Sequence, residues 1–335
     1  MKSEDFSVWL LAISGMSAAQ RTEALTAIKK AAADAASGMK TTGKRREDAL
    51  GTTGVERVER QGCPHCASRE IVGWGRSDGL LRYRCKACRR TFNALTKTPM
   101  AHLRKKEKWL DHAQAMIEGM SLAKTAKLCG VHPTTAFRWR HRFLRAPSDD
   151  KPRTLSGIVE ADETFILESF KGRWSDLPRK ARKRGGTARH PGPYQDNIPV
   201  LVARDRKGAT FDAVLPQVTS AAISAALAGL VTPANHLVGD GGPIAGFARR
   251  AGIPFHAAPS PGKPTPEAPH LHINNVNAYH SRLKQWLNRF NGVATKNLPS
   301  YLGWRRALEA WGQPVDPPKW ILSAIGNGPY QQITL

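Results

Sequence analysis

The chain has few cysteines and no long apolar run, and both shortages exclude classes of protein. Five cysteines among 335 residues are too few for a disulfide-stapled secreted domain, which is usually small and cysteine-rich. No stretch approaches the roughly 18 to 20 apolar residues that a membrane-spanning helix needs. The opening apolar run, residues 8–13, is too short for a secretory signal and follows two acids, Glu4 and Asp5. We therefore expect a cytoplasmic protein that makes no use of a membrane.

Acidic residues are scarce as well. Lys and Arg number 51 against 27 Asp and Glu, which gives a formal net charge of +24 at pH 7. A surplus of this size is typical of proteins with a polyanionic partner, most often nucleic acid. A ribosomal protein or a membrane-surface protein would also be basic, but no basic amphipathic helix stands out. At roughly 100 to 200 residues per domain, the length predicts two or three domains.

The cysteines that are present follow a pattern. Four of the five form two C-x-x-C pairs, namely Cys63, Cys66, Cys85 and Cys88. Two such pairs can close a tetrahedral thiolate site around one structural Zn²⁺. The alternative use, two disulfides, would require an oxidising compartment. We predict a zinc ribbon at residues 55–95.

Between the two pairs there is room for a β-hairpin. Residues 70–74 and 80–84 are predicted strands, and Ser77-Asp78-Gly79 supplies the turn. Basic residues surround the second pair and could contact phosphate, although a solvated surface explains them nearly as well. The fifth cysteine, Cys129, lies on an apolar helical face, which predicts a core position.

Before the cysteines, residues 1–50 read as a helical N-terminal region. Ser17 and Gln20 have capping-box spacing ahead of a segment rich in alanine and other good helix formers. Residues 38–54 are polar, basic and glycine-containing, which favours a linker.

After the cysteines, residues 104–146 indicate a helix-turn-helix domain. Residues 109–144 carry the pattern of three helices, with Gly130 placed for the sharp turn and Pro133 near the first position of the last helix. Three apolar residues recur there at helical spacing and should face inward: Ala136, Trp139 and Phe143. An ordinary helical hairpin is the alternative.

The outer face of that last helix is polar and basic. With the apolar side turned inward, four side chains would be free to meet a DNA major groove: Thr134, Thr135, Arg138 and His141.

Residues 146–153 form a polar, proline-containing segment that we interpret as a hinge. After it, strand-like runs alternate with helical patterns, so residues 154–310 predict a mixed α/β domain. Strands are expected at 158–166, 198–205, 209–215 and 236–239, the second and third as a hairpin, and helices at 220–230, 243–251 and from about 275. Residues 311–335 are left as a C-terminal tail.

Two aspartates stand out by position, because Asp162 lies within the first strand and Asp240 directly follows the strand 236–239. A carboxylate buried in such a place costs several kcal/mol unless it is compensated, and a divalent metal would compensate it. Taken alone, each is more often a capping or turn residue. Strand alternation places Glu160 and Thr164 on the face of Asp162, and Glu163 on the other face.

Farther along, Asn277 and Lys284 are seven residues apart on one predicted helix and so share nearly the same face. An asparagine oxygen can bind a metal, and a lysine can bind phosphate. His270 and His272 could also bind metal, although a structural or DNA-contacting role is favoured.

Several motifs together resemble one known family. The catalytic part contains Val159-Glu-Ala-Asp-Glu-Thr-Phe-Ile166, Gly239-Asp240, His272-Ile-Asn-Asn-Val-Asn277 and Leu298-Pro-Ser-Tyr-Leu-Gly-Trp-Arg305. A basic insertion at 171–190 has eight Lys or Arg residues against one acid. With these motifs, the chain from about residue 6 to 309 is similar to insertion-sequence DDE-type transposases of the ISXO-two-like group.

The resemblance implies a multidomain protein in which a helical N-terminus, a zinc ribbon and a helix-turn-helix precede an RNase H-like mixed α/β catalytic domain. Asp162 and Asp240 would be the first two catalytic acids and magnesium ligands, and Lys284 the lysine after the third. Asn277 stands where many relatives have Glu. Because Asn brings no charge, its metal would be held more weakly, and Glu160 or Glu163 could compensate.

The implied reaction is DNA phosphoryl transfer. Two catalytic Mg²⁺ ions, for which Mn²⁺ could substitute, would support attack by water at the element end and then by the freed 3′-hydroxyl on target DNA. The implied partners are the terminal inverted repeats, target DNA and further copies of the chain assembled on DNA, in the bacterial nucleoid. The basic insertion would clamp DNA through Arg179, Lys180, Arg182, Lys183 and Arg184, with a mobile solvated loop as the alternative. A non-catalytic or decayed DNA-binding protein is the competing hypothesis.

Overall fold

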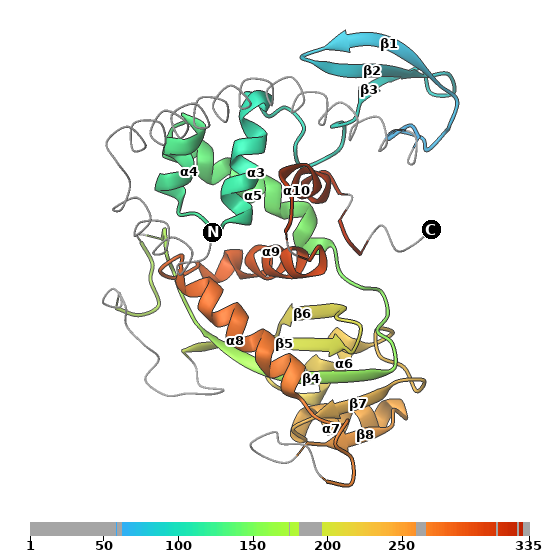
Figure 1. The fold of residues 1–335 in the computed structure, drawn as a ribbon, viewed down its shortest axis with the longest axis vertical. Coiled ribbons are helices and arrows are strands. Elements are labelled where there is room, and N and C mark those ends of the chain that lie inside the picture. Colours follow the sequence, from blue (N-terminus) through green and yellow to red (C-terminus); the bar gives the residue numbers. More distant parts are fainter. Residues whose placement is uncertain are drawn as a thin grey trace, which may run out of the picture.

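The structure is a computed structural model that describes residues 58, 62–173, 175–180, 196–258, 266–312, 314–326 and 328–330. The predicted helical region 1–50 and the linker 38–54 lie outside the described residues. Within them, three hydrophobic clusters organise the fold: one in a small sheet and one on each face of a larger sheet. The small sheet stands at one end of the molecule, beyond a group of helices (Figure 1).

The small sheet has the order β1-β2-β3 and is antiparallel throughout. Its strands are β1 (Ile71–Ser77), β2 (Leu80–Cys85) and β3 (Thr91–Asn93). Asp78 and Gly79 make the turn with positive φ angles of 50° and 76°, as a two-residue hairpin turn requires. The predicted hairpin is therefore present, and β3 was not anticipated. Its core is formed by Val58, Phe92 and Ala94 together with two of the cysteines.

The helical group follows the small sheet. It comprises the short 3₁₀ helix η1 (Lys106–Lys108), α3 (Trp109–Ile117), α4 (Leu122–Cys129) and α5 (Pro133–Asp149). The Ser121 side chain accepts a hydrogen bond from Lys124 N at the start of α4, and Gly130 ends that helix with φ 59°. Pro133 opens α5. The three predicted helices are confirmed, and Cys129 is fully buried as expected.

The segment predicted as a hinge is instead helical for half its length. α5 continues through Pro147 to Asp149. Arg306 explains why this end is fixed: its guanidinium donates hydrogen bonds to the carbonyl oxygens of Pro147 at 2.9 Å, Ser148 at 3.0 Å and Asp150 at 3.0 Å. These bonds satisfy carbonyl groups that a helix C-terminus leaves without intrahelical partners.

The large sheet has the order β6-β5-β4-β7-β8. Its strands are β4 (Ile158–Leu167), β5 (Asn197–Asp205), β6 (Thr210–Val214), β7 (His236–Gly239) and β8 (Phe255–Ala257). β5 pairs antiparallel with both β4 and β6, whereas β7 pairs parallel with both β4 and β8. The expected hairpin is β5–β6, and β8 was not anticipated.

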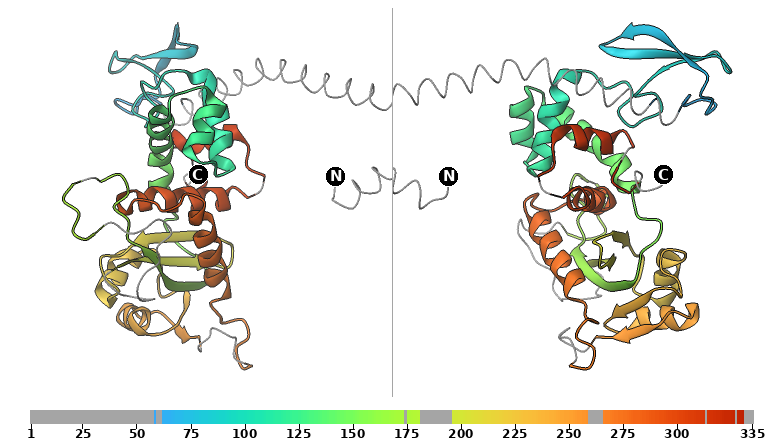
Figure 2. Two further views of the ribbon diagram at one scale, coloured as in Figure 1. Left: turned by 90° about the vertical axis from the view of Figure 1, so that its left-hand side faces the viewer. Right: turned by 45° about the vertical axis from the view of Figure 1, so that its right-hand side comes forward.

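Helices cover both faces of this sheet (Figure 2). One face carries α8 (Asn274–Asn288), which contacts β4 and β5, and α9 (Leu298–Ala310), which contacts β6 and follows the 3₁₀ helix η2 (Thr295–Asn297). The other face packs with α6 (Ser220–Leu227) and α7 (Gly242–Ala251) around a separate core that includes Ile223 and Phe247.

The expected C-terminal tail contains a further helix. α10 (Pro317–Ala324) contacts α3 and α5, and its Trp320 is fully buried. The Trp320 ring N–H points at the Met116 sulfur, 3.4 Å away. The helix-turn-helix, α9 and α10 therefore share one hydrophobic core rather than forming independent domains. Among the described residues, no helix is long and apolar enough to cross a bilayer.

Candidate functional site

Three carboxylates meet at the large sheet, from Asp162, Glu163 and Asp240. One oxygen of each lies within 4.8 Å of the other two. Asp162 and Glu163 come from β4, and Asp240 follows the last residue of β7. The two aspartates predicted from sequence are thus brought together by the parallel pairing of β4 with β7.

Glu163 was expected on the opposite face of β4, and the strand does direct it there. Its β5 partner, Leu201, belongs to the core beneath the far face of the sheet. The carboxylate still reaches the cluster because β7 pairs with β4 only as far as Glu160. Beyond that residue, no strand of the described part of the chain pairs with this edge of β4 beside Glu163. A side chain from either face can therefore reach the end of β7.

Two glycines allow Asp240 to lie where it does. A Cβ on Gly239 would be 3.2 Å from the Ala161 carbonyl oxygen and 3.1 Å from Ile244, tighter than ordinary packing permits. Gly241 adopts φ 109° and ψ −140°, a conformation that essentially only glycine reaches. The chain therefore turns sharply from β7 into α7 and leaves Asp240 exposed at the mouth of the cluster.

The clustered carboxylates carry more negative charge than their surroundings compensate. Burial, reinforced by the charge of Asp240, raises the pKa of Asp162 to about 6, although Lys284 acts in the opposite direction. Burial and the charges of Asp240 and Asp162 raise the pKa of Glu163 to about 7. Perturbation of this kind is common at functional sites, and a bound cation would relieve it.

α8 carries a second set of polar side chains, of which His280 and Lys284 interact with Asp162. Asn277 is half-buried on this helix, three residues before His280 and seven before Lys284, so all three share nearly one face. His280 Nδ1 lies 3.6 Å from an Asp162 oxygen. Burial and then the charge of Lys284 lower the pKa of His280 to about 4, so the imidazole is neutral at pH 7 and forms no ion pair.

Glu160 does not belong to the carboxylate cluster but binds the first turn of α8. Its fully buried carboxylate accepts hydrogen bonds from Val276 N at 2.9 Å and from the Asn275 side chain at 2.8 Å, both in the first turn of α8. Arg206 pairs with it at 2.7 Å, and the His272 ring lies 3.5 Å away. Glu160 therefore fixes the start of α8 against β4 and is not available to the carboxylate cluster.

The four paired cysteines also converge. Their sulfur atoms lie within 4.8 Å of one another, with Cys63–Cys88 and Cys66–Cys85 at 3.6 Å. These separations exclude disulfides, whose sulfurs are about 2.05 Å apart. They approach the ~3.8 Å between ligands of a tetrahedral ion with metal–sulfur bonds of about 2.3 Å. Four thiols in this arrangement fit zinc.

The predicted DNA-contacting face of α5 is only partly open. The predicted inward residues Ala136, Trp139 and Phe143 are buried, while Thr134 and Arg138 are exposed. Thr135 and His141 are half-buried, and the His141 ring lies 4.4 Å from that of Phe137. Phe137 is 44% exposed on the same surface, and sequence reasoning had not singled it out.

Of the five DNA contacts predicted in the basic insertion, the structure describes Arg179 and Lys180. Arg179 donates a hydrogen bond to the Glu168 carbonyl oxygen at 3.2 Å and lies 3.8 Å from its carboxylate, whereas Lys180 is exposed. The remaining predicted DNA contacts, Arg182, Lys183 and Arg184, lie outside the described residues.

Parts of the sequence match known proteins. Residues 102–149 match a homeodomain-like domain family. A protein from Halobacterium salinarum, described as an uncharacterized protein in transposable element ISH50, is 36% identical over 150 residues. The chain is thus similar to an insertion-sequence protein. The match covers 43% of this chain and 49% of the relative, so the chain spans about half of that protein's length.

Solved structures give weaker likenesses. A simian T-cell lymphotropic virus intasome chain is 14% identical, with a TM-score of 0.27 and coverage of 58% of this chain and 67% of that one. A pre-cleavage Mos1 transpososome chain is 15% identical, with a TM-score of 0.24 and coverage of 68% and 81%. At these TM-scores no residue role can be transferred.

Two residues of the site were missed or undervalued from sequence. His280 lies on the helical face shared by Asn277 and Lys284, and that spacing was the signal that could have identified it. Glu163 could not be placed by strand alternation, because its position depends on where β7 ends.

Proposed function

We propose that this chain is a DDE-type transposase that binds the ends of an insertion sequence and catalyses metal-dependent strand cleavage and transfer. The observation that carries the proposal is the meeting of Asp162, Glu163 and Asp240 within 4.8 Å of one another. The strand order, with three antiparallel strands followed by two parallel ones, supports the RNase H-like expectation for the catalytic domain. The homeodomain-like match supports DNA binding by α4 and α5.

The carboxylate cluster fits hard divalent cations, because its donors are all carboxylate oxygens and burial has raised two of their pKa values. Two Mg²⁺ or Mn²⁺ ions held there would activate the attacking oxygen and stabilise the leaving one. Lys284, whose charge acts on Asp162, would bind phosphate there, and neutral His280 adds no charge that would repel a cation.

Glu163 supplies the negative charge that Asn277 lacks. Sequence reasoning left Glu160 and Glu163 as equal candidates for this compensation. Glu160 is committed to the first turn of α8, whereas the Glu163 carboxylate lies in the cluster and one of its oxygens is buried without a hydrogen bond among the described residues. Asp162, Asp240 and Glu163 are therefore the proposed magnesium ligands, with Asn277 at the periphery.

Cleavage of labelled element ends tests the catalytic proposal. Wild type should nick the ends only with Mg²⁺ or Mn²⁺, and Asp162→Ala or Asp240→Ala should lower the rate by at least about 100-fold, since each removes charge from the site of phosphoryl transfer. DNA affinity should change little in both variants. Cleavage that survives either substitution would contradict the assignment.

The role of Glu163 is tested by Mg²⁺ titration of the cleavage rate. Glu163→Gln should raise the Mg²⁺ concentration needed for half-maximal rate, and Asn277→Glu should restore part of the loss because it returns one negative charge. Glu168→Gln, at a glutamate that pairs with Arg179 outside the cluster, is the matched control. An unchanged requirement in Glu163→Gln would remove it from the ligand set.

The remaining partners belong to the same proposal. Zn²⁺ at the four cysteines would be structural, and the element's terminal repeats and target DNA would bind as substrates to an oligomer of the chain. A decayed transposase that only binds DNA is the second candidate, favoured by Asn277 at the third acidic position. A protein that binds DNA but does not cleave it with any divalent metal would support this second candidate.

A further inference from the structure

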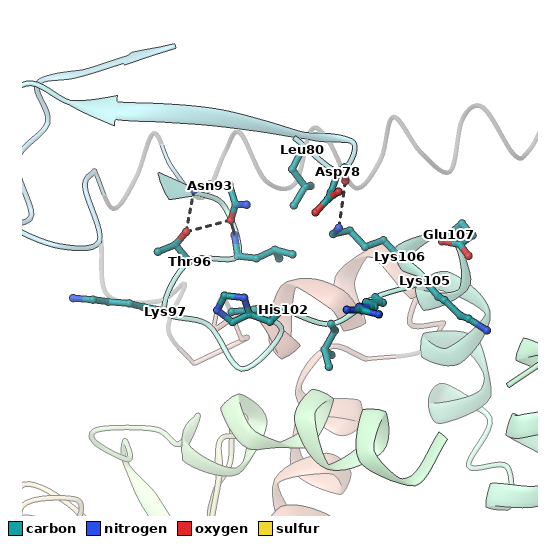
Figure 3. A pocket seen from close by; sticks show the side chains of 13 residues that line it. Asp78, Leu80, Asn93, Thr96, Lys97, His102, Lys105, Lys106 and Glu107 are labelled. Carbon is teal, nitrogen blue, oxygen red and sulfur yellow. Dashed lines mark hydrogen bonds between the residues drawn. The ribbon is translucent and has the colours of Figure 1, made fainter. Parts of the chain in front are cut away.

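A cavity of about 650 Å³ separates the small sheet from the segment that leads into α3. The sheet contributes the β1–β2 turn at Asp78 and strand residues Leu80 and Asn93. The opposite wall is the connecting segment, residues 95–107 (Figure 3). We call this cavity the ribbon groove. None of the residues assigned to the catalytic cluster or to the four-cysteine site lines it.

The ribbon groove is predominantly basic. Four of its lining residues are cationic, namely Lys97, Arg104, Lys105 and Lys106, against the acids Asp78 and Glu107. Lys106 is half-buried and donates to the Asp78 carbonyl oxygen at 3.3 Å, so it spans the two walls. Lys97, Arg104 and Lys105 are exposed, and none has an ion pair with another described residue. As far as the described ranges go, their charges are therefore available to bind an anion.

The backbone of both walls is held in an uncommon conformation. Four non-glycine lining residues have positive φ: Asp78 at 50°, Lys97 at 59°, His102 at 63° and Lys105 at 56°. Residues other than Gly, Asn, Asp and His rarely adopt this region, so Lys97 and Lys105 are the unusual ones, and such residues persist where surrounding contacts impose them. The connecting segment thus presents its cations in an imposed arrangement rather than as a loose chain.

The side chain of Arg142 fixes the position of the ribbon groove relative to the helix-turn-helix. Arg142 of α5 donates hydrogen bonds to the carbonyl oxygens of Pro99 and of Ala101, the latter at 2.8 Å. The cationic wall is therefore fixed to the same helix whose N-terminal half exposes Thr134 and Arg138. If α5 binds a DNA duplex, the distance between the phosphates of that duplex and the cationic wall is therefore fixed.

We infer that the ribbon groove is a binding site for the DNA phosphodiester backbone beside the sequence read by α5. The inference rests on the proposed function only in taking DNA as the partner. Spaced, unpaired cations across a polar cavity suit repeated phosphates, whereas a compact anion would need them to converge on one point. Contacts of this kind position the protein and do not read bases.

The test measures affinity for labelled mixed-sequence duplex DNA across a salt series, using the full-length protein. Lys97→Ala, Arg104→Ala and Lys105→Ala are combined in one variant. Each cation that no longer neutralises a phosphate should make the slope of log K against log salt less steep by about 0.9, so the triple variant should lose up to about 2.7. The change in slope should be the same for duplexes of different sequence.

A matched variant controls for total charge. Lys207→Ala, Arg249→Ala and Lys319→Ala remove two lysines and one arginine that are equally exposed but lie away from the groove. This control should keep the wild-type slope. Lys97→Arg with Lys105→Arg retains the charge and should do the same.

An unchanged slope in the groove variant, or an equal change in the matched control, would overturn the inference while leaving DNA binding itself intact. A wild-type protein that binds no DNA would instead defeat the proposed function. A wild-type protein that binds but never cleaves would leave the ribbon groove standing as part of a DNA-binding protein.

Discussion

His112 is a fully buried histidine in α3 whose ring nitrogens have no hydrogen-bond partner among the described residues. Its ring lies edge-on to Trp139 at 5.5 Å and close to Phe143 at 4.9 Å. Burial, and then the positive charge of Arg140, lower the pKa of His112 to about 3. The helical core therefore holds this side chain in its neutral form.

This burial predicts a pH dependence of stability. Below the ordinary histidine pKa of 6.5, the unfolded chain binds a proton at His112 that the folded chain refuses until about pH 3, so stability is lost as pH falls between these values. One proton corresponds to about 1.4 kcal/mol per pH unit. His112→Phe should make this dependence less steep in urea unfolding at pH 4 to 7, while buried His280 keeps its own contribution. If His112→Phe and wild type lose stability in parallel as pH falls, His112 is not the group responsible.

The contact between α5 and α9 is the element-scale feature that joins the helix-turn-helix to the large sheet. Gly303 of α9 lies directly against the end of α5, where an added Cβ would be 2.5 Å from the Pro147 carbonyl oxygen and 2.6 Å from the Ser148 Cα. Arg306, one turn later, binds the same carbonyl groups and pairs with Asp212 of β6. α9 thereby ties α5 to the sheet.

The stability of Gly303→Ala tests how tightly α9 packs against the end of α5. Alanine is favoured over glycine in a helix by about 1 kcal/mol, yet here the new methyl group would meet backbone atoms that cannot rotate away. Overpacking of this kind costs typically about 1 to 3 kcal/mol, so after the gain in helix propensity we expect net destabilisation of up to about 2 kcal/mol in urea unfolding. Ser300→Ala on the same helix should change stability by under about 0.5 kcal/mol. A stabilised Gly303→Ala protein would show that the two helices separate easily.

At the scale of the whole molecule, the small sheet has a core of its own, built around Cys63, Cys85 and Phe92. The residues of this core do not belong to either cluster of the large sheet. A core of this size holds too little apolar surface to fold alone, so the proposed Zn²⁺ site at the four thiolates should supply most of its stability.

Metal removal tests this separation. Purified wild type should contain one Zn²⁺ per chain and Cys85→Ser should contain none, while Cys129→Ala, at a cysteine outside the cluster, should retain the ion. In hydrogen exchange, Cys85→Ser should lose protection in β1 to β3 and keep it in β4 and β5. Loss of protection across the large sheet as well would show that the two parts fold as one unit.

The sequence by itself was sufficient for features that depend on short spacing. The two C-x-x-C pairs, the turn at Gly130, the start of α5 at Pro133 and the strand preceding Asp240 all follow from residues close in the chain, because turn, cap and strand preferences are local. Asp162 and Asp240 each stood out by position relative to a strand, and the resemblance to DDE-type transposases implied that they act as a pair.

Only the tertiary structure decided which acids share a site and which elements share a core. Glu163 joins Asp162 and Glu160 does not, because β7 ends beside Glu160 and the first turn of α8 occupies that carboxylate. α10 completes the helix-turn-helix from the far end of the chain. These outcomes depend on strand pairing and packing between segments that are distant in the sequence. The free energy of such contacts depends on where other elements end, and residues close together in the chain do not determine those end points.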